Sequence, residues 1–322
     1  MSITILFENE DWMPPLRKGL DTTGLDYKEQ FVDGGILNLG LEPEEQIVIN
    51  RMSPSSHTRG HQAGVQFVRE YLTFLEEKGV RIINGSRSFR LEVSKVQQDA
   101  ALQAAGIRTP HTIAVTGTEK LIEASKQMKT PFITKHNQGG KGLGVQLFKS
   151  HEAFEDFIKA GKYEDSPDSI NLLQEYIEPA EKFITRVEIV DGKFLYAIRS
   201  STEDGFELCP ADACSVGDAF CPAPDSSATK AAKFQPRHEI TADDPLVLAY
   251  IEFCKNHDID VAGIEFVEDK EGNRYTYDIN STSNYNATVE DEVGIYGMKA
   301  IAELVAKELQ KTGTPALHSN AA

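Results

Sequence analysis

A short glycine-rich stretch is the first feature of this sequence whose residue types could hold a ligand. It comprises Gly139, Gly140, Lys141, Gly142, Leu143 and Gly144. Glycines allow the backbone N–H groups of such a loop to close over phosphate groups, and Lys135 on the preceding predicted strand could supply a positive charge. A loop tip that binds nothing is the alternative interpretation.

Two other nucleotide-binding motifs do not fit this stretch. A P-loop requires Gly-Lys followed by Ser or Thr, whereas Lys141 is followed by Gly142. A dinucleotide fingerprint ends a strand and opens a helix, yet residues 145–148 read as a further strand. The stretch is therefore predicted to be the loop of a β-hairpin.

Oxygen-bearing side chains in a later predicted hairpin suggest a magnesium site. A four-residue loop from 269 to 272 would place Glu265 opposite Thr276. The side-chain period of two then puts Asp278 and Asn280 on the same face as Glu265. Mg²⁺ prefers such oxygen ligands and takes the remainder from water and phosphates. A solvated acidic face is the alternative, although both carboxylates lie in apolar runs typical of buried strands.

A hairpin predicted around the Asp-Gly turn at 191–192 brings two arginines together. The turn would pair Val190 with Lys193. Arg186 and Arg199 then become neighbours on one face of the sheet. Adjacent guanidinium groups repel each other unless an anion lies between them, so the pair could clamp a phosphate or a substrate carboxylate. A surface network of arginine and glutamate side chains is the alternative.

The elements that would position these groups alternate between strand and helix. The first ninety residues predict a small α/β domain with a helix between Gly60 and Gly79, because Val65, Val68, Leu72 and Leu75 recur at helical spacing. Further helices are expected at 92–105, 118–128, 153–160, 245–256 and 296–311, and residues 209–243 predict no regular structure. The expected strands are 3–7, 47–49, 80–83, 111–115, 131–135, 145–148, 170–176, 182–190, 193–200, 261–267 and 274–280.

Composition narrows the class of protein. The chain has 322 residues, with 33 basic and 50 acidic ones and a net charge of −17. Non-specific nucleic-acid binding depends mainly on basic residues, so no nucleic-acid partner is expected, and the acidity at first argues against any anionic ligand. The N-terminus lacks a basic lead, and no apolar stretch approaches the roughly 20 residues of a membrane span. Four cysteines are too few for a disulfide scaffold, which indicates a cytoplasmic protein.

Three smaller features stay open. The spacing of Cys209, Cys214 and Cys221 is not a zinc pattern, so reduced thiols are expected there. A polar cluster at 51–59 follows a predicted strand, where α/β sheets bind ligands, but a solvated loop fits equally well. His136 is interpreted as a packing or hydrogen-bonding residue rather than as a catalytic base.

Several residues and motifs, in their order along the chain, resemble the ATP-grasp superfamily, especially the branch of ribosomal-protein glutamate ligases and glutathione synthetases. They are Lys95, Lys135, the glycine-rich stretch at 139–144, the Gln-Glu-Tyr-Ile segment at 174–177, and the set Glu265, Asp278 and Asn280. The resemblance covers about residues 84–309. It implies an α/β (α+β) ATP-grasp fold with an N-terminal Rossmann-like pre-ATP-grasp domain. The implied divisions are an N-terminal domain at 1–90, a linker helix and small ATP-grasp subdomain at 91–180, a C-terminal subdomain with the metal site at 181–311, and a flexible tail at 312–322.

The resemblance also implies roles for individual residues. Lys95 and Lys135 match the two ATP-contacting lysines, and the loop 139–144 matches the one that covers the phosphates. Arg186 and Arg199 match basic positions near the transferred phosphate, where Lys141 would also act. The matched magnesium ligands are Glu265, Asp278 and Asn280, with Mn²⁺ as an alternative metal. The hinge whose backbone holds the adenine matches Gln174, Glu175, Tyr176 and Ile177.

The implied activity is ATP- and Mg²⁺-dependent ligation of a carboxylate to an amine through an acyl phosphate. A small-molecule kinase and a non-catalytic nucleotide-binding module are the alternatives. Small-molecule or peptide substrates are expected. The sequence does not fix the oligomeric state, although the resemblance allows a homo-oligomer because relatives are often dimers or tetramers. Two departures concern the substrates: Ile184 replaces an acidic ribose contact, for which Glu178 or Glu181 would substitute, and no Pro-Gly turn follows Asn280.

Overall fold

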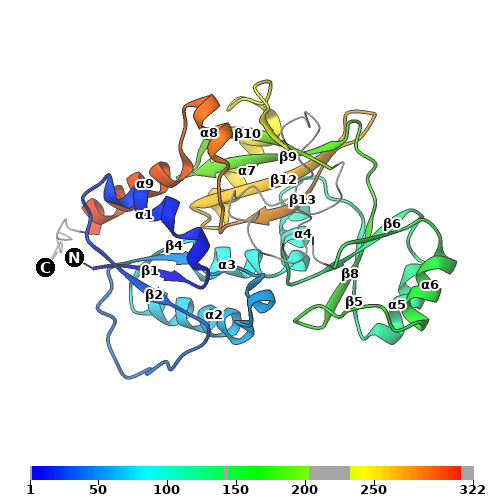
Figure 1. Ribbon diagram of the computed structural model, residues 1–322, viewed down its shortest axis with the longest axis horizontal. Helices are drawn as coiled ribbons and strands as arrows, with labels where there is room; N and C mark the ends of the chain where they lie inside the picture. The colour runs from blue at the N-terminus through cyan, green and yellow to red at the C-terminus, as the bar shows by residue number, and fades with distance from the viewer. Residues whose placement is uncertain (1, 141, 143, 203–232, 313–322) are drawn as a thin grey trace, which may run out of the picture.

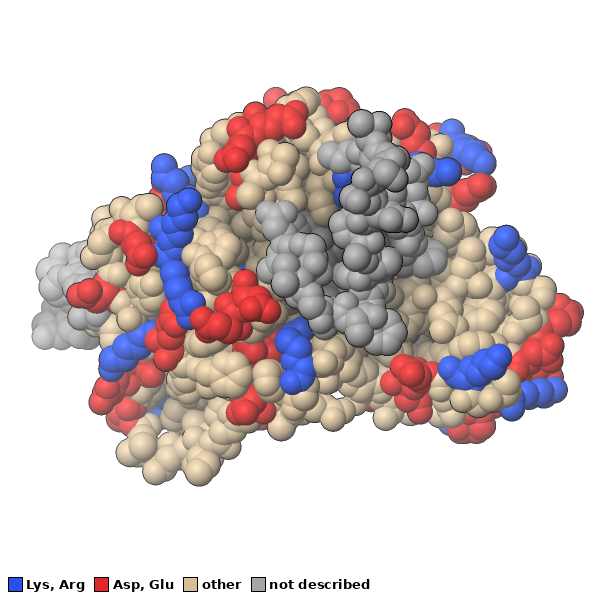
Figure 2. Space-filling view, viewed as in Figure 1, with Lys and Arg blue, Asp and Glu red and all other residues tan. Residues whose placement is uncertain are grey.

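The computed structural model describes residues 2–140, 142, 144–202 and 233–312. Over these residues the chain forms three sheets, which Figure 1 shows as a left lobe, an upper layer and a right lobe. Among the described residues, no helix combines the length and the apolar character that crossing a membrane demands. Acidic side chains are spread over both ends of the face seen in Figure 2, with Lys and Arg between them.

The first sheet is parallel and has the strand order β2-β1-β3-β4. Its strands are β1 (Ile3–Phe7), β2 (Tyr27–Phe31), β3 (Ile47–Arg51) and β4 (Arg81–Ile83). One face packs on α2 (Gln62–Glu77), whose buried side chains are those that the periodicity predicts, namely Val65, Val68, Leu72 and Leu75. The helix ends just before Gly79, which has a left-handed φ of 81°.

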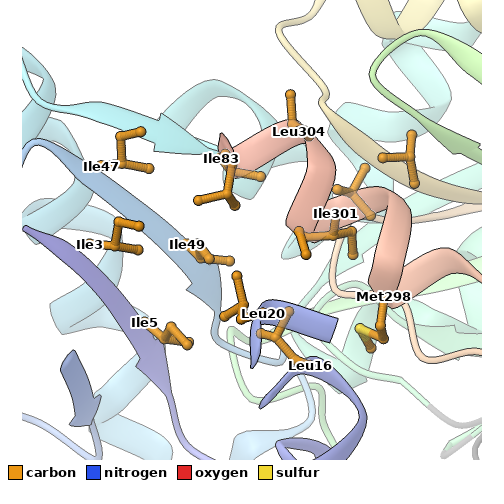
Figure 3. Packing of buried hydrophobic residues seen from close by; sticks show 14 of the residues in the cluster. Ile3, Ile5, Leu16, Leu20, Ile47, Ile49, Ile83, Met298, Ile301 and Leu304 are labelled. Atoms are coloured by element: carbon orange, nitrogen blue, oxygen red, sulfur yellow. The ribbon is translucent and has the colours of Figure 1, made fainter. Parts of the chain in front are cut away.

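The opposite face of this sheet is covered by α1 (Pro14–Asp21) and by α9 (Gly297–Thr312), the last helix of the described chain. Figure 3 shows isoleucines of the sheet facing Met298, Ile301 and Leu304 of α9. The core of the N-terminal sheet is therefore completed by a helix almost 300 residues away in sequence, and the two ends of the chain stabilise each other.

The two covering helices approach closely at Gly19. A Cβ at this position would lie 2.7 Å from the carbonyl oxygen of Met298 in α9. We expect Gly19→Ala to lower the free energy of unfolding by about 1–3 kcal/mol, because the backbone of α9 would have to move. Urea unfolding followed by circular dichroism measures this. Gly34→Ala is the control, since its nearest neighbour would be 3.9 Å away, and equal stability of the two variants would contradict the argument.

The second sheet is antiparallel and has the order β5-β8-β6-β7. Its strands are β5 (Thr112–Thr116), β6 (Phe132–His136), β7 (Gln146–Phe148) and β8 (Ile170–Glu175). Aromatic and aliphatic side chains pack one face on α5 (Leu121–Ser125) and α6 (His151–Lys159). Phe132 pairs with Phe148, so the glycine-rich stretch does join two strands of a hairpin.

The third sheet has the order β11-β10-β9-β12-β13. Its strands are β9 (Phe183–Val190), β10 (Lys193–Ser201), β11 (Phe234–Pro236), β12 (Val261–Glu268) and β13 (Arg274–Asn280), and α7 (Pro245–Asn256) buries Tyr250 and Phe253 against one face. Val190 pairs with Lys193, as the Asp-Gly turn predicts. The other face looks toward the junction of the three sheets.

Two expectations about elements are wrong. The helix expected at 92–105 begins later, as α4 (Lys95–Ala104), because the Ser94 side chain caps it by accepting from the Gln97 N–H, and Glu92 instead ends a separate helix, α3 (Ser86–Glu92). Within 209–243, residues 234–236 form β11 along the edge of β10, while Cys209, Cys214 and Cys221 lie outside the described residues. The sequence pattern also predicts neither α1, β2 nor α8 (Ala287–Val293).

Candidate functional site

A cleft lies where the three sheets meet, and it encloses about 1450 Å³ including its open mouth. Most residues singled out in the sequence line it: Lys95, Lys135, Gly139, Gly140, Gly142, Gln174, Glu175, Tyr176, Ile177, Arg186, Glu265, Asp278 and Asn280. Arg199 and Gly144 do not line it, and Lys141 lies outside the described residues. Side chains from four separated stretches of sequence thus converge on one place.

The acidic set shares one face of the sheet, but its strand pairing differs from the expected one. Glu265 lies opposite Asp278 rather than Thr276. One residue of the shift arises at the turn, where Glu268 pairs with Arg274, and the other arises at a bulge beside Glu265. Each one-residue shift reverses the face, so two together restore it. The shared face is therefore confirmed although the expected partner is wrong.

A single one-residue shift in strand register moves Arg199 to the other face of the third sheet. A bulge between Phe194 and Tyr196 puts Arg199 opposite Thr185, so its side chain leaves the face of Arg186. It is exposed, its guanidinium donates to Gln235 Oε1 at 2.7 Å, and it stacks over the Phe183 ring at 5.7 Å. The expected arginine pair is therefore wrong, and Arg199 has no place in the cleft.

Both Lys95 and Lys135 line the cleft, the first from the helix α4 and the second from the strand β6. Lys95, the first residue of α4, places its Nζ 2.5 Å from Asp278 Oδ1. Lys135 on β6 donates to the Tyr277 carbonyl at 3.1 Å and lies 5.0 Å from the centre of the Tyr277 ring. Burial, and then the positive charge of Lys95, lower the pKa of Lys135 to about 8. Two buried ammonium groups near each other favour a bound anion.

The two carboxylates differ in their electrostatic surroundings. Burial, and then the charge of Asp278, raise the pKa of Glu265, whose oxygens accept from Arg186 at 3.2 Å and from the Tyr277 hydroxyl at 3.1 Å. Burial alone would raise the pKa of Asp278, but the charges of Lys95 and Lys135 hold it below its ordinary value. The surroundings therefore favour the charged form of Asp278 more strongly than that of Glu265.

Oxygens that lack partners test whether this set fits a divalent cation. Asp278 Oδ2 has no hydrogen-bond partner among the described residues. Asn280 donates its Nδ2 to the Gly263 carbonyl at 3.3 Å, which leaves its Oδ1 for another partner. No three His, Cys, Asp or Glu side chains of the described chain form a complete metal site by themselves. Two carboxylates and an amide oxygen are a partial set of oxygen ligands, which suits a Mg²⁺ ion because Mg²⁺ takes further ligands from water and phosphates.

Arg186 on β9 is buried at the cleft and links its own strand to β12 and to the loop after β13. It donates to Glu188 Oε1 at 2.6 Å, to Glu265 Oε1 at 3.2 Å and to Ser283 Oγ at 2.9 Å. The opposite strand makes room for it with Gly263, where a Cβ would lie 2.1 Å from the guanidinium. The positive charge of Arg186 therefore balances the carboxylates of Glu188 and Glu265, and its side chain also lines the cleft.

The glycine hairpin lies over the cleft from β6 and β7. Gly142 and Gly144 adopt left-handed φ angles of 74° and 75°. A Cβ on Gly144 would meet the His136 ring at 2.6 Å, so this glycine packs at the base of the loop instead of lining the cleft. His136 Nε2 donates to the Glu164 carbonyl at 3.0 Å, as expected for a hydrogen-bonding residue.

The hinge residues comprise the last two residues of β8, Gln174 and Glu175, and the next two, Tyr176 and Ile177, and all four line the cleft. The Glu175 N–H donates to the His111 carbonyl at 2.8 Å and the Tyr176 N–H to the Pro131 carbonyl at 3.4 Å, whereas the Ile177 N–H has no partner among the described residues. A base could bind there. Glu178, the expected ribose contact, is exposed and pairs with Lys270 at 3.0 Å, and neither it nor Glu181 lines the cleft.

Several cleft residues escape the sequence reasoning. Trp12 comes from a short 3-10 helix after β1, and Ser53 and Ser55 follow β3, the position that the strand-end argument left open. Glu92, at the end of α3, accepts from the Ser281 N–H, and burial raises its pKa. The remaining ones are Tyr277, Thr282 and Asn284. They lie in a 3-10 helix, at a helix end, within β13 and in the loops after β3 and β13, and no shared sequence pattern identifies them.

Comparisons with known proteins agree with this geometry. Residues 93–208 match the model of the RimK-like ATP-grasp domain. No curated protein matches the chain by sequence. Among solved structures, the ATP-grasp ligase PsnB in complex with a minimal precursor is 14% identical, with a TM-score of 0.64 and coverage of 96% of this chain and 99% of PsnB.

Two further structures are similar over nearly the whole chain. D-cycloserine synthetase DcsG is 17% identical, with a TM-score of 0.65 and coverage of 96% of this chain and 100% of DcsG. D-alanine–D-alanine ligase from Bacillus anthracis is 16% identical, with a TM-score of 0.66 and coverage of 97% and 98%. The expected fold class is confirmed: this chain has the ATP-grasp fold, and its residues 93–208 are similar to the RimK-like ATP-grasp domain.

Proposed function

We propose that this protein is an ATP- and Mg²⁺-dependent ligase that joins a small-molecule or peptide carboxylate to an amine in the cytoplasm. The observation that carries the proposal is the convergence of Lys95, Lys135, Asp278 and Asn280 on one cleft beneath a glycine hairpin. Structures similar to this one include PsnB with its precursor, Mg and ADP, and a D-alanine–D-alanine ligase with ATP.

Different residues of the cleft would bind the adenine, the phosphates and the metal ion. The Ile177 N–H, which has no partner among the described residues, could donate to the adenine, while Lys95 and Lys135 would neutralise phosphate oxygens. The Gly139 and Gly140 backbone would cover those oxygens from above. Asp278, Asn280 and Glu265 would hold Mg²⁺, which when bound offsets the phosphate charge. Phosphoryl transfer depends mainly on such positioning and charge neutralisation.

The proposed chemistry has two steps. A carboxylate oxygen of the first substrate attacks the γ-phosphorus of ATP, the bond from that phosphorus to the β–γ bridging oxygen breaks, and ADP leaves. The amine then attacks the acyl carbon of the resulting acyl phosphate, the carbon–oxygen bond to phosphate breaks, and the amine loses a proton. Because water would hydrolyse the acyl phosphate, the glycine hairpin over the cleft would serve to exclude it.

Release of ADP tests the proposal. The purified protein is incubated with ATP and Mg²⁺ and a panel of carboxylates, with and without amines, and ADP is measured by a coupled assay. A ligase should release ADP faster when both a carboxylate and an amine are present and should form an amide. ADP release with a polyol alone, without a carboxylate, would instead identify a kinase and refute the ligase.

The low pKa of Lys135 predicts a pH dependence of nucleotide binding. Above pH 8 this lysine is mostly neutral in the free protein, because its pKa is about 8. Phosphates favour the ammonium form, so the affinity for ADP should fall by up to about tenfold per pH unit above that pKa. Calorimetric titrations at pH 7 and pH 9 measure this. Lys135→Arg keeps its charge and should lose the dependence; equal slopes in both proteins would contradict the assignment.

A further inference from the structure

Two asparagines at the cleft present opposite ends of their amides to it. Asn280 donates its Nδ2 to the Gly263 carbonyl, and since a carbonyl oxygen only accepts, the Asn280 Oδ1 is the end left over. Asn284 Oδ1 accepts from Arg51 Nη2 at 2.7 Å, and since a guanidinium only donates, the Asn284 Nδ2 is the end that has no partner among the described residues. The first amide offers an acceptor suited to a cation, and the second offers two N–H donors.

Arg51 fixes the orientation of the second amide. It is the last residue of β3 in the N-terminal sheet and is 4% exposed. Besides Asn284 it donates to the Ser283 carbonyl at 2.7 Å, and the carbonyl of the next residue, Met52, accepts from Thr282 Oγ1 at 3.0 Å. Residues 51–52 therefore hold three consecutive residues of the loop after β13, which lacks the Pro-Gly turn of relatives.

The same loop is tied to the metal-side residues. Ser283 Oγ accepts from Arg186 Nη2 at 2.9 Å, and Arg186 in turn donates to Glu265. The Asn284 side chain therefore stands on a framework that is anchored in the first and third sheets at once. A polar group held this firmly keeps its donors aimed at one place, which is what recognition of an oxygen requires.

The part of the cleft beside Asn284 belongs to the N-terminal sheet. Ser53 and Ser55, which follow Arg51, line the cleft together with Trp12 and Thr282, and the buried Glu92 lines it beside Ser281. The Thr282 hydroxyl already donates to Met52, so the Asn284 amide, the serine hydroxyls and the Trp12 ring are the groups that suit an oxygen-bearing organic group. The phosphate-binding lysines border the other part of the same cleft, so a substrate bound here would face the nucleotide site.

We propose that Asn284 binds a carboxylate oxygen of the organic substrate through its Nδ2 and that Arg51 is the positioning residue that turns this end of the amide to the cleft. This inference rests on the proposed function, because it supplies the carboxylate that the ligase reaction consumes. Asn284 is then a specificity-determining residue: a substrate lacking the carboxylate would leave its N–H donors without an acceptor.

The only tryptophan of the chain provides a binding readout that does not need turnover, since Trp12 lines this part of the cleft. Free amino acids, N-acetyl amino acids and short dicarboxylic acids are titrated into the protein with ADP and Mg²⁺ while Trp12 fluorescence is followed. ADP release with ATP is measured on the same panel. At least one carboxylate should change the fluorescence and also stimulate ADP release.

Asn284→Asp is the decisive variant. It keeps an oxygen for Arg51 but replaces the N–H donors by a second carboxylate oxygen, which repels an anionic substrate. We expect Kd and KM for the best carboxylate to rise by about tenfold or more, with the Kd for ADP unchanged. Asn38→Asp makes the same change in charge in an exposed loop, where the side-chain oxygen keeps its bond from the Gly40 N–H, and should have no effect.

Arg51→Lys separates positioning from direct contact. A lysine keeps the charge but cannot hold both Ser283 and Asn284 in one plane, so the amide can rotate. Carboxylate affinity should fall, but by less than in Asn284→Asp. Unchanged carboxylate affinity in Asn284→Asp would overturn the inference while leaving the ligase proposal intact. If no carboxylate alters the fluorescence or stimulates ADP release in the wild-type protein, both proposals fail.

Discussion

Replacing Asp278 with asparagine should lower kcat/KM for ATP by about 100-fold or more. The substitution preserves the shape of the side chain but removes the charge that faces Lys95 at 2.5 Å and the free Oδ2 that would hold Mg²⁺. It also leaves Glu265 as the single carboxylate of the set, and burial raises the pKa of that group. Mg²⁺ affinity should therefore fall together with turnover.

Steady-state ADP release at a series of Mg²⁺ concentrations measures the effect. Excess Mg²⁺ should restore part of the activity of Asp278→Asn, because weaker binding can be offset by mass action. Asp258→Asn is a suitable control, since Asp258 does not line the cleft and the one ion pair that it makes within the described part of the chain, with Arg87 at 3.0 Å, is exposed. An unaltered Mg²⁺ dependence in a folded Asp278→Asn protein would refute the metal assignment.

Replacing Arg186 with methionine should destabilise the fold by about 3–5 kcal/mol, because it leaves the carboxylates of Glu188 and Glu265 buried without their shared cation. Both side chains are almost fully buried, and burial already raises the pKa of each one in the wild-type protein. Removing Arg186 should raise these pKa values further, since its positive charge is the main influence that lowers them for Glu188 and one of those that do so for Glu265.

The loss should depend on pH. A carboxylate whose pKa is raised in the folded state stabilises the fold at low pH and loses that contribution as the pH rises through its folded pKa. The difference between wild type and Arg186→Met should therefore be larger at pH 8 than at pH 5, as measured by urea unfolding. Adding Glu188→Gln should recover part of it. A pH-independent loss would show that packing, and not charge, makes Arg186 important.

The net charge of the chain does not describe the charge of the cleft. A charge of −17 at first argues against anionic ligands. In the structure, Lys95, Lys135 and Arg186 are buried at one cleft, and part of the acid excess, Glu265 and Asp278, lies directly beside them. Total charge governs long-range attraction of polyanions, whereas a nucleotide would respond to the local cleft.

The sequence by itself predicted most of the strands and the longer helices, but not α1, β2, β11 or α8, because hydrophobic periodicity and turn residues act locally and are weak in short elements. It identified Lys95, Lys135 and the face shared by Glu265, Asp278 and Asn280. Bulges, which depend on how a strand meets its neighbours, decided the rest of the strand register: two shifts preserved that face, and one shift removed Arg199.

Only the tertiary structure decided which distant residues complete the cleft. Arg51 and Asn284 are separated by 233 positions, and Trp12 reaches the same wall from near the N-terminus. Such contacts arise because α9 and the loop after β13 pack back onto the N-terminal sheet. Local patterns carry no information about that packing, since the free energy that brings these segments together comes from burying side chains of both ends of the chain at once.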